Sequence, residues 1–285
     1  GEWREPRGRP DPAAPPPLRD RLVGEPLWGV SPVAAAFAAS RREPHALYVQ
    51  EGINEKKRKD AAALHAIVAA AEGAGTPVVE ASKHELNLIT GNRPHQGVVL
   101  DCGGLEFLPL ETLTAADAAR GGAGGKSPVW VALDEVMDPM NFGAVLRSAH
   151  FMGAAGVVAC ARNSAPLSAT VSKASAGAME LMPVFSAKSM PSFLKRCAVE
   201  GWEVVGADGG HPSAESCLGY EPRGPTVLVL GSEGDGMRTN VRNACTRYVS
   251  VPRGPSAHEL VDSLNISVAA GVLLQRLIAA APALP

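Results

Sequence analysis

Arg147 stands out chemically in the segment DEVMDPMNFGAVLRSA, residues 134–149. Asp138 and Pro139 end the apolar run before it, and Asn141 is a residue type that caps helix N-termini. A capping role is enough to explain Asn141. Packing does not explain Arg147, because arginine is seldom buried without a partner. An arginine inside the apolar helical series that follows therefore indicates binding rather than packing.

Two further segments combine polar side chains with small residues. GSEGDG, residues 231–236, follows an apolar run, so its glycines would let backbone approach a ligand closely, with Glu233 at the end of a buried strand. The third segment is VDSLNISVAAG, residues 261–271. In it, Ser263 and Asn265 put a hydroxyl and an amide at the start of an Ala-rich helix. Taken singly, the second segment is also typical of a tight turn and the third of a helix cap. Their combination with Arg147 favours a site.

Two nucleotide-binding patterns are approached but not matched. In GGAGGKS, residues 121–127, the phosphate-loop form GxxxxGK[ST] would need glycine where Arg120 stands, and no strand precedes the segment. Residues 231–236 run GxxGxG, whereas the dinucleotide fingerprint is GxGxxG at the start of a helix. These departures disfavour a P-loop protein and a dinucleotide-dependent oxidoreductase.

Composition points to a globular protein of one or two domains, with 285 residues, 46% of them hydrophobic, and a net charge of -2. The longest apolar stretch, residues 266–284, contains Gln275 and Arg276, so we expect no membrane span. The cysteines are odd in number and form no CxxC pair, which argues against a disulfide framework or a zinc site. We expect no metal, and five thiols that serve core packing: Cys102, Cys160, Cys197, Cys217 and Cys245.

The chain divides into four parts. Residues 1–26 carry seven prolines, which predicts a disordered arm or the remnant of a leader. Residues 27–102 form a small α/β domain, residues 103–128 a glycine-rich linker, and residues 129–281 a larger α/β domain. The arginines of the arm are matched by acids, so its targeting signal is weak.

Strands and helices alternate in both domains, and apolar runs such as residues 227–230 are typical of strands buried on both faces of a parallel sheet. The larger domain should therefore be a doubly wound sheet with its ligand beyond the carboxyl ends of the strands. The predicted strands are 46–49, 77–80, 97–100, 129–133, 156–159, 182–185, 203–207, 226–231 and 248–251. The predicted helices are 30–40, 61–72, 83–89, 142–152, 169–176, 190–200, 240–244 and 265–280.

Together, the patterns NxGxxxRSA, LxLGSEGxG and SLNxSxAxG resemble the three motifs of the SpoU (TrmH-like) branch of the SPOUT methyltransferases. The resemblance implies transfer of a methyl group from S-adenosylmethionine to a ribose 2'-hydroxyl of tRNA or ribosomal RNA. It extends from residue 129 to about 280, and His95-Gln96-Gly97 resembles the end of the family's small N-terminal RNA-binding domain. The chain looks most like members that methylate guanosine in the large-subunit ribosomal RNA of mitochondria. That implies a mitochondrial matrix location, with cytoplasm or plastid as alternatives.

The resemblance also implies roles for individual residues. The catalytic set would be Arg147, Asn141, Glu233, Ser263 and Asn265, with Asn141 holding Arg147. The cofactor would bind where loops cross in a deep trefoil knot, at Leu230, Gly231, Val251 and Leu264. The active site would lie across the interface of a homodimer. Because a guanidinium is a poor base, we expect Arg147 to orient the 2'-hydroxyl and adjacent phosphate.

RNA binding must depend on local basic runs, because the net charge is slightly negative. A charge run is more often a solvated face. Nearer the expected site stand Arg162, Lys173 and Arg253. The candidates in the small domain are Arg41, Arg42, Lys56, Lys57, Arg58 and Lys59.

Two classes of function fit these residues. One is an RNA 2'-O-methyltransferase that acts on ribosomal RNA or tRNA. The other is a ribosome-assembly factor that keeps the fold and the RNA-binding surface with little catalysis. Since all of the polar residues of the implied active site are present, the sequence favours the enzyme.

Overall fold

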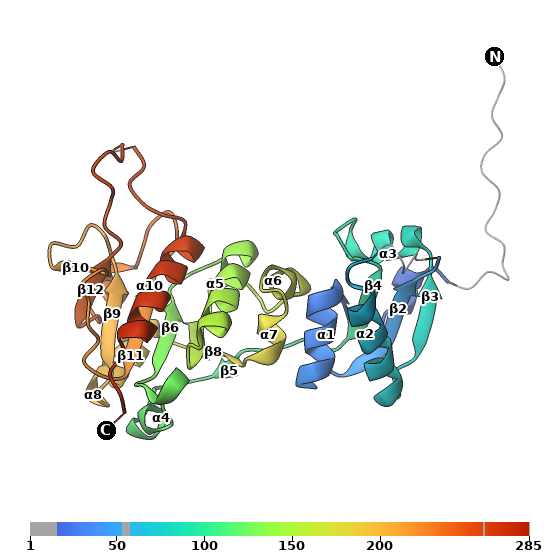
Figure 1. Ribbon diagram of the computed structural model, residues 1–285, viewed down its shortest axis with the longest axis horizontal. Helices are drawn as coiled ribbons and strands as arrows, with labels where there is room; N and C mark the ends of the chain where they lie inside the picture. The colour runs from blue at the N-terminus through green and yellow to red at the C-terminus, as the bar shows by residue number, and fades with distance from the viewer. Residues whose placement is uncertain (1–15, 53–57, 259, 285) are drawn as a thin grey trace, which may run out of the picture.

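The computed structural model describes residues 16–52, 58–258 and 260–284. Two domains lie side by side, with α1 (Val30–Ala39) of the small domain facing α6 (Ala169–Ala174) and α7 (Ala178–Leu181) of the large one (Figure 1). Lys56 and Lys57 lie outside the described residues.

The small domain is a four-stranded sheet covered by three helices. The sheet order is β1-β4-β2-β3, with β4 antiparallel to both of its neighbours and β2 parallel to β3. The helices and the sheet enclose one core. It contains Leu27 and Leu47 from the strands and Ile67 and Leu86 from the helices. The remaining elements are β1 (Glu25–Trp28), β2 (Pro44–Gln50), β3 (Val78–Ala81), β4 (Val98–Cys102), α2 (Ala61–Gly73) and α3 (Lys83–Thr90).

The small domain begins earlier than the sequence predicts. Leu18, in the short 3-10 helix Leu18–Arg21, is only 2% exposed and belongs to the domain core. The buried Asp101 carboxylate then accepts hydrogen bonds from the backbone N–H groups of Val23 and Gly24, both at 2.8 Å. The prediction of a disordered arm up to residue 26 is therefore wrong for residues 18–26, because a partner distant in sequence orders them.

The large domain is built on an eight-stranded sheet in the order β10-β12-β9-β11-β6-β7-β8-β5, with every neighbouring pair parallel. Its strands are β5 (Leu108–Pro109), β6 (Val129–Leu133), β7 (Gly156–Cys160), β8 (Val184–Ala187), β9 (Glu203–Ala207), β10 (Ala214–Ser216), β11 (Thr226–Leu230) and β12 (Arg247–Ser250). Its longer helices are α5 (Pro139–Met152), α8 (Met190–Val199) and α10 (Ile266–Ala280). Short helices are α4 (Ala115–Ala119), α9 (Thr239–Arg242) and the 3-10 turn Ala123–Gly125.

Both faces of this sheet are covered, as predicted for a doubly wound domain. Phe142 of α5 and Leu274 of α10 pack on one face, in a cluster with Val131 and Leu228. Phe193 of α8 belongs to a second cluster on the other face. Because all strands are parallel, their carboxyl ends share one edge, where loops can form a ligand site. The trefoil crossing of those loops stays a prediction.

The segment predicted as a linker is largely folded onto the large domain. Strand β5 extends the sheet beside β8, and Leu113 is buried at 1% exposure. Thr114 caps α4 in a capping box with Asp117, and its carbonyl accepts a hydrogen bond from the Trp202 indole at 3.2 Å. The linker prediction of 103–128 is therefore too long, since the segment from Leu108 onward belongs to the large domain.

Candidate active site

The N-terminus of α5 is capped by Asp138 and not, as predicted, by Asn141. The Asp138 carboxylate accepts hydrogen bonds from the backbone N–H groups of Met140 at 2.6 Å and Asn141 at 2.9 Å, and Pro139 occupies the first turn. Asn141 therefore lies inside the first turn of α5, with its side-chain amide available for other partners.

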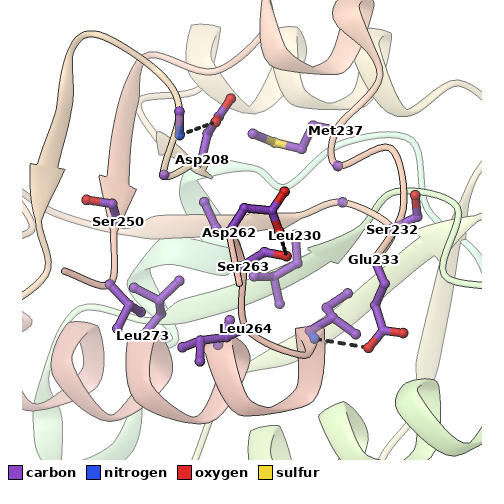
Figure 2. Close-up of a pocket in the computed structure, with 18 of the residues that line it drawn as sticks. Asp208, Leu230, Ser232, Glu233, Met237, Ser250, Asp262, Ser263, Leu264 and Leu273 are labelled. Carbon is purple, nitrogen blue, oxygen red and sulfur yellow. Dashed lines mark hydrogen bonds between the residues drawn. The ribbon is translucent and has the colours of Figure 1, made fainter. Parts of the chain in front are cut away.

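The side chain of Asn265 joins the three polar segments. Its oxygen caps α10 by accepting from the backbone N–H of Ser267 at 2.9 Å. Its amide donates to the side-chain oxygen of Asn141 at 3.0 Å and also to the carboxylate of Glu233. The same Glu233 oxygen accepts from the backbone N–H of Ile266 at 3.3 Å, a contact visible at the helix start in Figure 2. Loops far apart in the sequence thus meet at one polar junction, which we call the Asn–Glu junction (Asn141, Glu233 and Asn265).

Arg147 is exposed on α5 and makes no hydrogen bond or ion pair within the part of the chain that the structure describes. The expectation that Asn141 holds Arg147 is wrong for this chain, because the side-chain oxygen of Asn141 is bonded to Asn265. The fifth predicted residue, Ser263, donates its hydroxyl to the carboxylate of Asp262 at 3.0 Å. Because Arg147 is exposed and makes no contact of this kind in the described residues, its guanidinium is free to bind a partner from outside the chain.

A pocket of about 870 Å³ opens beside the Asn–Glu junction, at the carboxyl edge of the sheet. Its walls come from the loops after β9, β11 and β12 and from the first turns of α10 (Figure 2). Ser263 and Glu233 line it, whereas Arg147 does not. All of the residues predicted to bind the cofactor are among the lining residues: Leu230, Gly231, Val251 and Leu264.

The loop after β11, residues 231–236, which we call the glycine loop, needs glycine at its first position. Ser232 and Gly236 exchange two backbone hydrogen bonds, at 3.1 and 3.0 Å, which fold the loop back on Gly231. A Cβ at Gly231 would lie 2.1 Å from the carbonyl carbon of Gly236 and 2.2 Å from the nitrogen of Met237. Any side chain at residue 231 must therefore displace backbone that lines the pocket. At Gly234 a Cβ would meet nothing within 4 Å.

A buried carboxylate anchors the far end of this loop, a feature that sequence reasoning missed. Asp134 is 1% exposed and accepts from the backbone N–H of Arg238 at 3.0 Å and from its guanidinium at 2.6 Å. The hydrogen bond to Asp134 raises the pKa of Arg238. An acid directly after a buried strand was the available signal, but its partner lies 104 residues away in the sequence.

Two of the arginines predicted to bind RNA instead form hydrogen bonds and an ion pair between the two domains. Arg42 is 6% exposed, and its Nε lies 2.7 Å from the carboxylate of the fully buried Glu180. Arg41 donates to the backbone carbonyls of Met179, Glu180 and Met182 at 3.0, 3.1 and 2.8 Å. The prediction of RNA contact is therefore wrong for Arg42, which is enclosed by protein, and the guanidinium of Arg41 is already engaged.

The other basic candidates are differently placed. Arg58 forms two hydrogen bonds to Asp60, each 2.7 Å long, while Lys59 is exposed. Lys173 lies half-buried on α6 and Arg162 is exposed. Arg253 lines the pocket and donates to the carbonyls of His258 and Val261, at 2.7 and 3.0 Å, which closes the long loop before α10.

Within residues 16–52, 58–258 and 260–284, no cluster of three His, Cys, Asp or Glu side chains is arranged to hold a metal ion. In the same described ranges, no helix has the length and apolarity needed to cross a membrane. All five cysteines carry free thiols.

Comparison with known proteins finds a matching family for each of the two domains. Residues 128–275 match the SpoU rRNA methylase family, and residues 26–108 match the RNA 2'-O ribose methyltransferase substrate-binding domain. The chain is 38% identical to human "rRNA methyltransferase 1, mitochondrial", covering 87% of this chain and 70% of the relative. It is 36% identical to the Schizosaccharomyces pombe protein of the same name, covering 88% and 89%. The AdoMet-bound rRNA methyltransferase from Sinorhizobium meliloti has the same fold, with a TM-score of 0.68 at 21% identity over 88% of this chain and 85% of that one. The chain belongs to the SpoU rRNA methylase family.

Proposed function

We propose that this protein transfers the methyl group of S-adenosylmethionine to a ribose 2'-hydroxyl of ribosomal RNA. The observation that carries the proposal is the Asn–Glu junction beside the pocket, because it unites the three polar segments at the carboxyl edge of the parallel sheet. The names of the relatives support ribosomal RNA as the substrate and a mitochondrial location.

The pocket has the size and lining that S-adenosylmethionine requires. Leu230, Leu264 and Leu273 offer apolar surface for the adenine ring. Backbone groups of the glycine loop can approach the ligand closely because Gly231 carries no side chain. The carboxylate of Asp262 lines the same pocket and would favour a ligand with cationic groups, whereas that of Asp208 is already paired with Arg242 at 2.8 Å. S-adenosylmethionine supplies an activated methyl group on a positively charged sulfonium.

The protein's own residues then act chiefly by positioning. Glu233 accepts two hydrogen bonds from the start of α10, so it holds that helix against the pocket rather than serving as a free base. Arg147 would bind the phosphate next to the reacting ribose and orient its hydroxyl. Aligning oxygen, methyl carbon and sulfur in this way supplies most of the rate acceleration that a weakly acidic hydroxyl requires.

We further infer a homodimer in which Arg147 serves the partner's pocket. Arg147 does not line the pocket of its own chain, and its helix neighbour Phe151 is 87% exposed. On the adjacent helix α10, Val268 and Val272 are 51% and 41% exposed. Side chains four positions apart share one helix face, so α5 and α10 present a shared apolar surface around the arginine. Burying that surface against a second copy would complete each site.

The finer assignments follow from the motifs and the relatives. The resemblance of the motif regions favours guanosine as the modified nucleoside. Ribosomal RNA of mitochondria lies in the matrix, so a mitochondrial member would act there.

Calorimetric titration with S-adenosylmethionine tests the pocket. We expect micromolar binding by the unaltered protein, loss of binding by Gly231→Leu, and retained binding by the matched Gly234→Ala variant, since residue 234 has open space. Absence of binding by the unaltered protein would contradict the proposed methyltransferase and leave the assembly factor as the better description.

A further inference from the structure

Two cations from opposite domains meet where the turn His95-Gln96 of the small domain touches α6. The Lys173 ammonium donates to the side-chain oxygen of Gln96 at 2.5 Å, and Arg93 donates to the hydroxyl of Thr170. Thr170 and Lys173 stand three positions apart on α6, so they share one face of that helix. We call Arg93, Gln96, Thr170 and Lys173 the interdomain cluster.

Neither cation of the interdomain cluster has an acidic partner among the described residues. Lys173 is half-buried, and this burial lowers the pKa of its ammonium. Arg93 is stacked over the Trp28 ring, with its guanidinium carbon 5.1 Å from the ring centre. Arg42, by contrast, is paired with Glu180. Arg93 is exposed, so only Lys173 is a partly desolvated cation without a counter-ion, and an anionic ligand would offset the cost of burying it.

The cluster is also well placed relative to the site. Helix α6 packs closely on α5, because a Cβ at Gly143 would lie 2.5 Å from the Cβ of Ala174. In Figure 1, α6 lies between α1 of the small domain and α5, the helix that carries Asn141 and Arg147. The Arg42–Glu180 pair joins the two domains, so the cations are held in position before any ligand arrives.

We propose that the interdomain cluster binds the phosphate backbone of the RNA substrate, with Arg93 and Lys173 each contacting phosphate and with Gln96 and Thr170 orienting them. This inference rests on the proposed function and adds a contact surface to it. Guanidinium and ammonium groups bind phosphate without reading bases, so the cluster recognises the path of the strand. The small domain thereby contributes to RNA binding through its junction with the large domain.

The test compares three paired variants in binding to an unmodified, fluorescently labelled transcript of the large-subunit ribosomal RNA over a range of salt concentrations. The test pair, Arg93→Gln with Lys173→Gln, removes both charges. The control pair, Lys188→Gln with Lys195→Gln, removes two exposed lysines at or near α8, on the other face of the sheet. The charge-retaining pair, Arg93→Lys with Lys173→Arg, keeps both charges on altered side chains.

We expect the test pair to lose about tenfold or more in affinity and to flatten the plot of log K against log salt by about one unit or more, since each phosphate contact contributes about 0.7 to 0.9. The control pair should bind like the unaltered protein, and the charge-retaining pair should recover most of the lost affinity. Equal binding by the test and control pairs would overturn the inference, as would an equal loss in the charge-retaining pair.

Methyl transfer by the unaltered protein is measured in the same preparation and separates the two proposals. If the unaltered protein methylates the transcript while the test pair binds it normally, only the interdomain cluster is refuted. If the unaltered protein binds S-adenosylmethionine and RNA without transferring a methyl group, the proposed function fails instead.

Discussion

The side-chain amide of Asn265 donates to the side-chain oxygen of Asn141 at 3.0 Å and connects the first turns of α10 and α5 across 124 residues of sequence. The same amide donates to Glu233, which follows β11. One side chain thus fixes two helix starts and the glycine loop relative to each other. The position of the pocket wall depends on this contact.

Two substitutions of Asn265 separate its two roles. Asn265→Ser keeps an oxygen that caps α10 but removes the amide donor, so we expect a free energy of unfolding within about 0.5 kcal/mol of the unaltered value. Methyl transfer should nevertheless fall by on the order of tenfold to a hundredfold, because the helix starts lose their register. Asn265→Ala also removes the capping oxygen, so its free energy of unfolding should be about 1 kcal/mol lower than that of Asn265→Ser. Urea unfolding and single-turnover rates measure both effects; full activity of Asn265→Ser would remove the amide from the site.

Arg147→Ala should abolish methyl transfer while leaving the fold and cofactor affinity nearly unchanged, because Arg147 is exposed and unpaired in the described structure. Thermal unfolding and calorimetry check stability and binding, and a methyl-transfer assay checks the rate. An active Arg147→Ala protein would exclude the residue from the reaction.

Mixing inactive variants tests whether Arg147 serves the partner's pocket. In a mixed dimer of Arg147→Ala and Gly231→Leu, one pocket keeps its glycine and receives the intact arginine of the other chain. Random exchange should then restore roughly a quarter of full activity in a symmetric dimer. A mixture that stays inactive although native mass spectrometry shows mixed dimers would contradict the shared site.

The regular elements of the fold could be predicted well from the sequence. The strands Val129–Leu133 and Glu203–Ala207 have the predicted bounds, because continuous apolar runs are typical of strands buried on both faces. The edge strands Glu25–Trp28, Leu108–Pro109 and Ala214–Ser216 were missed. They are short, and pairing with distant strands stabilises them rather than any local pattern.

The sequence indicated which segments come together, but not the contacts between them. The three polar segments meet at the Asn–Glu junction, and the second and third of them line the pocket while the first does not. The cap of α5 is Asp138, and Asn141 bonds Asn265 rather than Arg147. Arg42 looks like a surface charge in the sequence because its partner, Glu180, lies 138 residues away. Composition cannot distinguish a buried ion pair from a solvated basic run, since only the fold brings the acid to it.

The Arg42–Glu180 pair should be a major source of stability at the domain junction. Arg42→Met leaves the fully buried Glu180 carboxylate without its cation and should cost about 3 to 5 kcal/mol of unfolding free energy. Adding Glu180→Gln removes the orphaned charge and should restore part of this loss. Arg120→Met is the surface control, because its 79% exposed side chain pairs weakly with Asp117. Chemical denaturation would contradict this role if Arg42→Met and Arg120→Met were equally stable.

Four cysteines should resist thiol reagents in the folded protein. Burial raises the pKa of Cys102 and Cys245 to about 12, that of Cys160 to about 11, and that of Cys197 in the same direction. A raised pKa leaves little thiolate at pH 8, and thiolate is the reactive form. Titration with a disulfide reagent should therefore be slow for these thiols until denaturant is added, when all five react. Rapid modification of Cys102 in the native state would contradict its burial.

Mapping methylated riboses most directly distinguishes an enzyme from an RNA-binding factor. The purified protein is incubated with S-adenosylmethionine and an unmodified transcript of the large-subunit ribosomal RNA, and 2'-O-methylated positions are identified by resistance to alkaline hydrolysis and by mass spectrometry. We expect one ribose to be methylated, at a guanosine, by the unaltered protein and not by Arg147→Ala. A transcript that stays unmodified, although the protein binds both it and S-adenosylmethionine, would contradict the methyltransferase assignment.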